Sequence, residues 1–451
     1  MFFDMKTIPA LIASLLLGFA SAAHGQYGYS TNADNTLTIT NYTGSGGVVT
    51  IPTNINGRTV TGIGAYAFYQ NTNLTSVTIP ETVTSLGLSA FQYCNMTSVV
   101  IPGSLNNIGN YAFARCSSLT NATISNGIPY IAQGMFGGCR VLSNVAIPLS
   151  VTSIGDEAFS GAGLASVTIP GRVTVFGYST FEQCFNLTNA TFSEGVPYIG
   201  DDMFAYCTNL TSVTIPSSLT TIEGGAFGGC GFTTIAIPDT VTDIEDVAFS
   251  GCSSLTNLTL PNSLTNLGQD AFLNCGGLSD LVIPGSGSGF GDFAFFGCGF
   301  TNIIIAGGVS NLAYAMFGQC FNLAGVFFGG NAPGLIGDYA GDGPPFNYDT
   351  NVTVYYLPGT TGWSNTYQGV PTVLWNPQIQ TADVDFGIRS NQFGFNITST
   401  NNIPIVIEAC TNLANPVWTP LTNVTLTNGS FYFSDPQWTN YPGRFYGIGF
   451  P

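Results

Sequence analysis

The chain has 451 residues, of which 45% are hydrophobic and only 7% are charged, and its net charge is −17. This hydrophobic content excludes an intrinsically disordered chain, which needs low hydrophobicity and high charge. The acidic charge excludes nucleic acid and anionic membrane surfaces as partners, because both repel a negatively charged protein.

Residues 1–25 have the pattern of a bacterial signal peptide. Lys6 provides a basic start, residues 8–20 form an apolar stretch too short for a transmembrane helix, and small residues follow it. This pattern predicts cleavage after Ala23 or Gly25 and therefore export. We expect the mature protein to be secreted or held at the cell surface, with no membrane insertion after cleavage.

Cleavage after Gly25 would remove the only lysine, Lys6, and the only histidine, His24, whereas cleavage after Ala23 would leave His24 as the first residue. Without imidazole or ammonium groups, the mature chain cannot form Ser-His-Asp or Cys-His nucleophilic sites, lysine Schiff bases or histidine metal sites. A general base near neutral pH would have to be a carboxylate, Cys or Tyr with a strongly shifted pKa. We therefore expect no catalytic residue, no metal site, no cofactor and no enzymatic activity.

Phenylalanine recurs at steps of 22 or 23 residues through most of the chain. The frame around it is clearest from Leu74, in LTSVTIPETVTSLGLSAFQYC. The 22-residue steps recur every 68 residues, which indicates duplication of a three-coil block. A fixed period of this length predicts a solenoid whose coils bury their apolar faces against one another. The repeated residues are Phe68, Phe91, Phe113, Phe136, Phe159, Phe181, Phe204, Phe227, Phe249, Phe272, Phe295 and Phe317.

Each coil should contain one strand, a second short extended stretch such as residues 83–86, and one short helix. Leu74, Val77 and Ile79 take the inward positions of an L-x-x-L-x-L strand. Pro80 ends the strand because it has no backbone N–H to donate. The A-F-x-x-C-x-x-L segment has helical spacing, which predicts one or two turns of α- or 3₁₀-helix with Ala, Phe, Cys and Leu pointing inward.

The domain boundaries follow from where the period holds. We predict about twelve coils over residues 58–330, an N-terminal cap at 26–57 and a C-terminal cap at 331–376. From residue 377 to 451 the period is lost, and short alternating segments such as FGFNIT and IPIVIEAC replace it. Such segments, separated by Asn, Gly and Pro turns, predict a small antiparallel β-sandwich.

The frame L-T-S-V-T-I-P-x-x-V-T-x-I-G-x-x-A-F-x-x-C resembles the BspA-type leucine-rich repeat, found mainly in secreted and surface proteins of bacteria. The resemblance covers roughly residues 58–330. It implies a leucine-rich-repeat solenoid without catalytic function that serves adhesion or the binding of proteins or glycans. The chain departs from the frame where Ser125 and Ser193 replace the strand-ending Pro, and where Asn71 and Ala162 replace Cys.

Ten of the eleven cysteines, from Cys94 to Cys320, occupy one repeat position three residues after the Phe. Equivalent Cα atoms of adjacent coils lie about 5 Å apart, which disulfide geometry allows. However, Ala162 fills the same position, and translation from coil to coil makes the thiols parallel. We therefore favour buried thiols over disulfides or a metal site.

Acidic residues cluster two to four positions before the Phe, as at Asp156 and Glu157. Helix N-termini favour carboxylates at such positions, so we interpret these residues as helix caps. A ladder of calcium sites is the alternative. In the last segment Glu408, Cys410 and Arg444 could converge with Asp435, but we expect all four to be turn and surface residues.

The outward strand positions are the candidate binding surface, because they form a flat, uncharged face of small polar side chains. This face has no aromatic anchors, so we expect weak contacts spread over many coils. An ordinary solvated sheet face would show the same pattern. The candidate residues are Ser76, Thr78, Asn121, Thr123, Asn144, Ser166, Thr168, Asn189, Thr191, Ser212, Thr214, Thr234, Asn257 and Thr259.

Together these features predict a non-enzymatic extracellular binding or adhesion protein, with an extracellular protein or polysaccharide as its partner. A structural component of the cell surface or matrix is the first alternative. A glycan-directed hydrolase is the second alternative, but no pair of carboxylates is singled out by its spacing.

Overall fold

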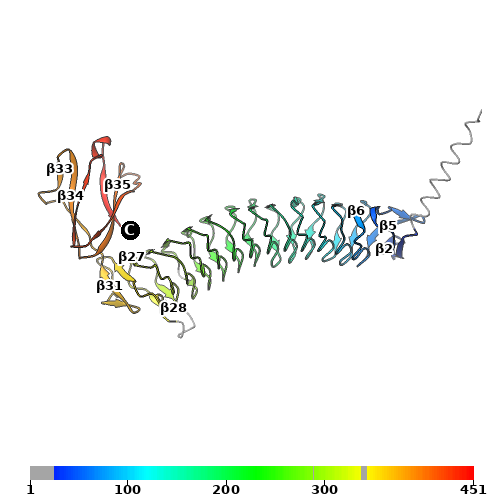
Figure 1. Cartoon of the computed structure of the whole chain (residues 1–451), viewed down its shortest axis with the longest axis horizontal. Coiled ribbons are helices and arrows are strands. Elements are labelled where there is room, and N and C mark those ends of the chain that lie inside the picture. Colours follow the sequence, from blue (N-terminus) through cyan, green and yellow to red (C-terminus); the bar gives the residue numbers. More distant parts are fainter. Residues whose placement is uncertain (1–24, 288, 337–342) are drawn as a thin grey trace, which may run out of the picture. The chain divides into compact units, whose positions relative to one another are not determined.

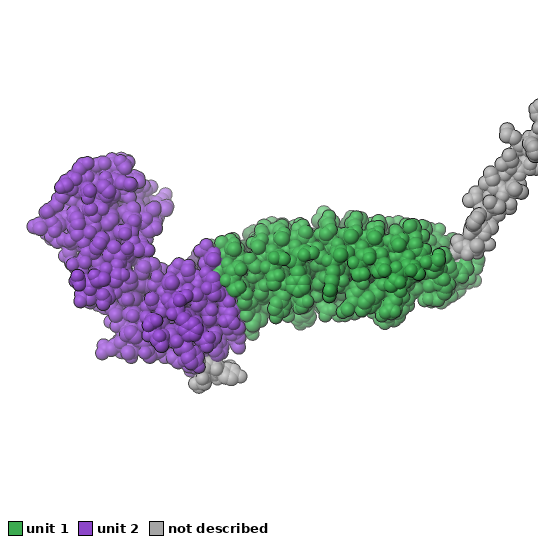
Figure 2. Space-filling view, viewed as in Figure 1, with its two compact units in different colours: residues 1–255 green, residues 256–451 purple. Residues whose placement is uncertain are grey.

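The computed structural model describes residues 25–287, 289–336 and 343–451. The chain forms two compact units, residues 1–255 and 256–451 (Figure 2). Coils of about 23 residues build most of both units, with about thirteen turns altogether, and antiparallel sheets follow at the C-terminus. The predicted solenoid and the predicted C-terminal β-structure are thus confirmed.

The predicted signal peptide, residues 1–25, lies outside the described residues except for Gly25. Among the residues that the structure describes, no helix is long and apolar enough to cross a membrane. The one helix in this part of the chain is the 3₁₀-helix η1 (Trp438–Asn440).

The first unit begins with an antiparallel pair of strands, which is followed by parallel pairing between coils. The Tyr42 ring stacks on Phe68, with the ring centroids 4.9 Å apart, so an aromatic ring already occupies the phenylalanine position here. The strands of this start are β1 (Tyr27–Thr31), β2 (Leu37–Tyr42), β4 (Asn54–Ile55) and β5 (Arg58–Ile63).

Most coils of the first unit then add a strand to the face predicted from the L-x-x-L-x-L pattern, and Figure 1 shows these strands side by side along the unit. Alternation sets their two faces, because Val77 is buried whereas Thr78 is exposed. The strands are β3 (Gly47–Thr50), β6 (Leu74–Thr78), β8 (Ser98–Ile101), β10 (Asn121–Ile124), β13 (Ser166–Ile169), β15 (Asn189–Phe192), β17 (Ser212–Thr214) and β19 (Thr234–Ala236).

A second ladder of two-residue strands follows each proline of the first unit. Its inward residues, such as Leu86 and Ile108, are buried. The strands are β7 (Ser85–Leu86), β9 (Asn107–Ile108), β11 (Tyr130–Ile131), β12 (Ser153–Ile154), β14 (Val175–Phe176), β16 (Tyr198–Ile199), β18 (Thr221–Ile222) and β20 (Asp243–Ile244).

Two tyrosines interrupt this second ladder at a spacing of 68 residues. The Tyr130 hydroxyl accepts a hydrogen bond from the Ile108 N–H at 2.7 Å, and the Tyr198 hydroxyl accepts one from the Phe176 N–H at 3.2 Å. The backbone pairing stops at both places, between β9 and β11 and between β14 and β16. The three-coil block seen in the sequence therefore has a structural counterpart.

The predicted short helix of each coil is wrong, because the A-F-x-x-C segment forms consecutive turns. The Phe68 N–H donates to the Ala90 oxygen of the next coil at 2.8 Å, whereas the following Tyr69 N–H donates to the Tyr66 oxygen at 3.0 Å. Along this segment, backbone N–H groups donate alternately to an oxygen of the neighbouring coil and to an oxygen of the same turn. In a helix, every N–H group would donate to an oxygen four residues earlier in the same segment. Left-handed residues two before and two after the Phe permit this path, for example Tyr66 (φ 58°) and Gln70 (φ 56°).

The phenylalanines form the predicted buried stack within each unit. The rings of Phe91 and Phe113 have centroids 5.3 Å apart and are nearly parallel, with an angle of 2° between their planes. In the second unit Phe346 continues the stack, with its centroid 5.9 Å from that of Phe317. Phe346 lies outside the 22–23-residue period, so the sequence did not predict it as a member of the stack. The structure has about thirteen turns, whereas the sequence predicted about twelve coils.

The second unit repeats the same two ladders. Its longer strands from β23 to β31 pair in parallel. The longer strands are β21 (Asn257–Thr259), β23 (Asp280–Ile283), β25 (Asn302–Ile305), β27 (Gly325–Phe328), β29 (Thr353–Tyr356) and β31 (Val370–Leu374), with β30 (Thr366–Tyr367) antiparallel to β31. The shorter strands are β22 (Asn266–Leu267), β24 (Gly289–Phe290), β26 (Asn311–Ala313) and β28 (Gly334–Ile336).

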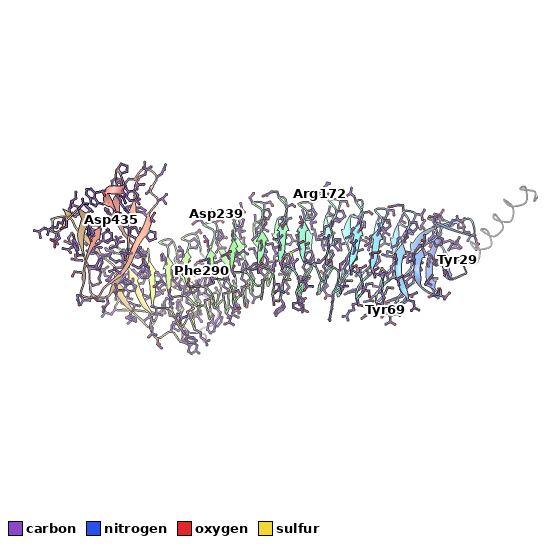
Figure 3. All side chains as sticks on the ribbon, turned by 45° about the horizontal axis from the view of Figure 1, so that its top comes forward. Tyr29, Tyr69, Arg172, Asp239, Phe290 and Asp435 are labelled. Atoms are coloured by element: carbon purple, nitrogen blue, oxygen red, sulfur yellow. The ribbon has the colours of Figure 1, made fainter. Side chains whose placement is uncertain are left out.

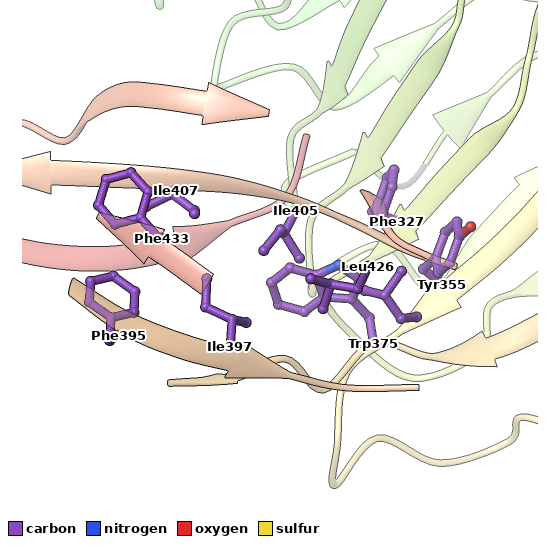
Figure 4. Close-up of a cluster of buried hydrophobic side chains, with 10 residues drawn as sticks. Phe327, Tyr355, Trp375, Phe395, Ile397, Ile405, Ile407, Leu426 and Phe433 are labelled. Atoms are coloured by element: carbon purple, nitrogen blue, oxygen red, sulfur yellow. The ribbon is translucent and has the colours of Figure 1, made fainter. Parts of the chain in front are cut away.

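Two antiparallel sheets end the second unit. Their shared core continues into the last coils, because Phe327, Tyr355 and Trp375 pack in one buried cluster with Phe395 and Ile405 (Figure 4). The first sheet contains β32 (Gln378–Gln380), β33 (Gly387–Arg389), β34 (Gln392–Thr398) and β37 (Ser430–Asp435). The second contains β35 (Ile403–Cys410), β36 (Thr419–Leu426) and β38 (Phe445–Gly449).

Candidate functional site

The predicted outward strand residues lie on one face of the coils. Three of the fourteen, Ser76, Asn189 and Thr191, are half-buried. The others are exposed, namely Thr78, Asn121, Thr123, Asn144, Ser166, Thr168, Ser212, Thr214 and Thr234 in the first unit and Asn257 and Thr259 in the second. The structure therefore presents most of these hydroxyl and amide groups to solvent.

The strand ladder of the first unit is interrupted in the coil of Asn144. This coil makes a single bridge, from Asn144 to Asn121, and residues 145–147 form no strand. A hollow of about 270 Å³ lies here, lined by Asn144, Ser166 and Thr168 among others. Three predicted site residues thus meet at one concave place on the strand face.

The same strand positions turn apolar near the C-terminus. In register across the last ladder, Ile304 pairs with Phe327, and Phe327 pairs with Tyr355. The C-terminal sheets cover this stretch, since Ile405 and Trp375 belong to the same cluster as Phe327 and Tyr355. Apolar strand positions are therefore buried within the second unit, whereas the polar positions of the first unit are exposed.

No disulfide joins any of the eleven cysteines, all of which are buried in the described part of the chain. This agrees with the prediction of buried thiols. Burial raises the pKa of the Cys94 and Cys320 thiols to about 12. Thiols with so high a pKa are poor nucleophiles and poor metal ligands, because both roles need the thiolate.

The acidic residues before the Phe do not cap helices, so that interpretation is wrong. One of them, Asp156, instead accepts a hydrogen bond from the backbone of a neighbouring coil, from the Tyr178 N–H at 3.0 Å. Burial and the nearby carboxylates of Asp201 and Glu245 raise the pKa of Glu223. Within the described ranges, no three His, Cys, Asp or Glu side chains are grouped so that they could hold a metal ion.

Two of the four residues considered in the last segment do converge. Asp435 and Arg444 form an ion pair at 3.0 Å, and both side chains are buried. The Tyr446 hydroxyl donates to Asp435 at 2.8 Å, and Cys410 is also buried. The expectation of turn and surface positions is therefore wrong for Asp435, Arg444 and Cys410. The ion pair links β37 to the segment before β38 and has the geometry of a structural contact.

A second surface of the first unit was not anticipated from the sequence. A groove of about 1040 Å³ follows the turns after the Phe through six coils, from Gln70 to Gln183. The sequence contains a pattern that could have predicted the groove. At the position two residues after each Phe, large side chains are replaced by glycine in two of the six coils. The residues at this position are Gln70, Tyr93, Arg115, Gly138, Gly161 and Gln183.

The chain is similar to several solved structures. A leucine rich cell surface protein from Faecalibacterium prausnitzii is 30% identical over 68% of this chain and 94% of its own, with a TM-score of 0.43. A leucine-rich repeat protein from Bacteroides ovatus is 23% identical over 77% of this chain and 98% of its own, with a TM-score of 0.52, which shows the same fold. The pneumococcal vaccine antigen PcpA is 18% identical over 74% and 92%, with a TM-score of 0.46.

A comparison with curated proteins gave no match. The family profile for the BspA type leucine rich repeat region matches residues 49–151, 130–256 and 242–340, which together span more than half of the chain. The twelve periodic phenylalanines, from Phe68 to Phe317, and the repeated cysteine position lie within these ranges. The chain belongs to the BspA-type leucine-rich repeat family.

Proposed function

We propose that the protein is a non-enzymatic extracellular binding or adhesion protein that presents its leucine-rich-repeat surface to protein or glycan partners. The observation that carries this proposal is the exposed strand face of the first unit. Its outward hydroxyl and amide groups are regularly spaced and uncovered, whereas the equivalent apolar positions near Phe327 are buried by the C-terminal sheets.

The family supports a location outside the cell. The relative from Faecalibacterium prausnitzii, 30% identical to this chain, is described as a cell surface protein. Residues 1–25 have the pattern of a signal peptide, which agrees with export. We propose that the mature protein is secreted or attached to the cell surface.

The hollow beside Asn144 offers a partner a concave contact on this face. Ser166 and Thr168 line it with hydroxyl groups that both donate and accept hydrogen bonds. The double variant Ser166→Gln/Thr168→Gln adds neutral bulk to the hollow, and we expect it to weaken binding to partners of the strand face. Binding to a panel of purified extracellular proteins and polysaccharides measures this effect.

The matched control is Thr152→Gln/Thr174→Gln, which changes two exposed residues next to the second ladder in adjacent coils. We expect the control to bind as the unchanged protein does. A panel without any ligand would contradict the proposal and favour a structural surface component. Equal losses in both double variants would also contradict a role of the strand face.

A further inference from the structure

We propose that the groove between Gln70 and Gln183 binds an anionic polysaccharide, with Arg115 and Arg140 contacting its carboxylate or sulfate groups. This inference rests on the proposed function in treating the chain as a binding protein. It assigns the contact to the turns after the Phe, which lie apart from the strand face.

The charge of the groove differs from that of the whole chain. The protein has 24 acidic residues and only seven basic ones. The lining of this groove, in contrast, has two arginines from adjacent coils and one acidic residue, Glu157. Arg115 and Arg140 are exposed, and neither forms an ion pair within the described residues, whereas Arg389 and Arg444 do. An unpaired guanidinium can bind a planar anion through two parallel hydrogen bonds.

The surroundings of Arg115 hold its guanidinium in place. The guanidinium carbon lies 5.8 Å from the centre of the Tyr93 ring, within the range of a cation–π contact. The stem of Arg115 passes over Gly138, where an added Cβ would lie 3.0 Å from the arginine Cγ. Glycine at position 138 therefore leaves room for the arginine, and its φ of 72° favours glycine there.

Glycine also makes room for a second side chain of the groove. A Cβ added at Gly134 would lie 2.2 Å from the Tyr111 ring, so this ring lies directly over the glycine. Both Tyr111 and Gly134 line the groove. The groove is therefore shaped by large residues of one coil that lie over glycines of the next coil.

A row of tyrosines leads into the groove at one end. The ring centroids of Tyr66 and Tyr69 are 5.5 Å apart, and those of Tyr69 and Tyr93 are 5.9 Å apart, both with edge-to-face geometry. Tyr66 and Tyr69 are exposed, and exposed tyrosine rings provide an apolar surface with a polar tip. The C–H faces of sugar rings pack against such surfaces, while their hydroxyl groups need hydrogen-bonding side chains.

The groove supplies those side chains along its length. Gln92, Asn95, Ser117, Ser160 and Gln183 line it, and amide and hydroxyl groups can both donate and accept hydrogen bonds. Six stacked coils give a length of about 25 Å at the usual strand spacing, which suits an extended chain of several sugars. A protein partner would need buried apolar anchors.

Affinity electrophoresis of the full mature chain tests the proposal. The gels contain polygalacturonate, which supplies carboxylates, dextran sulfate, which supplies sulfates, or neutral dextran. We expect retardation in at least one of the two anionic gels and none in dextran. The variant Arg115→Gln/Arg140→Gln should weaken this retardation by about tenfold or more, and added salt should weaken it too, because the contact is a charge-assisted one.

The matched control is Arg58→Gln/Arg172→Gln, which removes two positive charges from outside the groove. Figure 3 labels Arg172 at the opposite edge of the first unit from Tyr69. We expect the control to migrate as the unchanged protein does. The proposal would be overturned if neither anionic gel retarded the protein, or if neutral dextran retarded it equally. It would also be overturned if the control variant reduced retardation as much as Arg115→Gln/Arg140→Gln does.

The strand-face variant Ser166→Gln/Thr168→Gln separates this proposal from the function proposed above. It should leave retardation in the anionic gels unchanged. If it abolishes retardation while Arg115→Gln/Arg140→Gln does not, the groove is refuted and the strand face is supported. If this variant no longer binds the ligands found in the panel but is still retarded in the anionic gels, both the strand face and the groove are supported as binding surfaces.

Discussion

The thiol of Cys184 donates a hydrogen bond to the main-chain oxygen of Phe159, in the preceding coil, across 3.2 Å. Equivalent bonds recur along the ladder, for example from Cys298 to the oxygen of Phe272. Each thiol therefore satisfies a backbone oxygen inside the core, which a disulfide sulfur could not do because it has no proton to donate. The buried cysteines therefore both fill the core and donate hydrogen bonds to backbone oxygens of the preceding coil.

We expect the native protein to react slowly with a thiol reagent at pH 8, because its thiols are buried and burial raises the pKa of Cys94 and Cys320 to about 12. After denaturation without reductant, about ten thiols or more should react. The absorbance of the coloured thiolate that the reagent releases measures the number of reactive thiols before and after denaturation. Two or fewer reactive thiols after denaturation would show that the ladder is cross-linked.

The phenylalanine stack should carry much of the stability of the first unit. Phe204→Ala removes a fully buried ring from between two neighbouring rings, and we expect it to lower the free energy of unfolding by about 3–5 kcal/mol. Phe185→Ala is the control, because that ring is 52% exposed and should cost less than about 1 kcal/mol. Urea denaturation followed by circular dichroism compares the two, and similar losses would contradict the role of the stack.

Asp349 should make stability depend on pH. It lies three residues after Phe346, at the position that cysteine occupies in other coils, and burial raises its pKa from 3.8 to about 7. Between these two values the unfolded state binds fewer protons than the folded state, so stability should fall as the pH rises from about 4 to 7 and then level off.

Asp349→Asn removes this effect, and we expect it to raise the free energy of unfolding by a few kcal/mol, on the order of 2–4, at pH 8 and to change little at pH 4. Chemical denaturation at several pH values measures the difference. Asp280→Asn removes the same charge from an exposed strand position and should not alter the pH profile in this way. An equal gain for Asp349→Asn at both pH values would contradict a raised pKa.

The buried ion pair of the last sheets should matter more than an exposed one. Arg444→Ala leaves the buried carboxylate of Asp435 without its partner, and we expect a loss of about 3–5 kcal/mol. Arg389→Ala breaks the ion pair with Asp385, whose side chains are 52% and 38% exposed, and should cost less than about 1 kcal/mol. Thermal unfolding of the full chain compares the variants, and equal effects would show that burial of the pair contributes nothing.

The sequence by itself determined the coil. The period of the phenylalanines, the alternation of Val77 with Thr78 and the shared position of the cysteines all concern residues within about 23 positions of one another. Burial of such residues is set within one repeat, and translation along the stack copies it. The stacked rings, the polar strand face and the buried thiols could therefore be predicted from the pattern alone.

Only the tertiary structure decided what happens between coils and between distant strands. The A-F-x-x-C segment has helical spacing, yet it forms turns because every second N–H, as at Phe68, is used by the neighbouring coil. The groove is shaped where the Tyr111 ring lies over Gly134 of the next coil. The Asp435–Arg444 pair forms where the two C-terminal sheets pack against each other. These contacts depend on which side chains oppose one another in space, which a local sequence period does not encode.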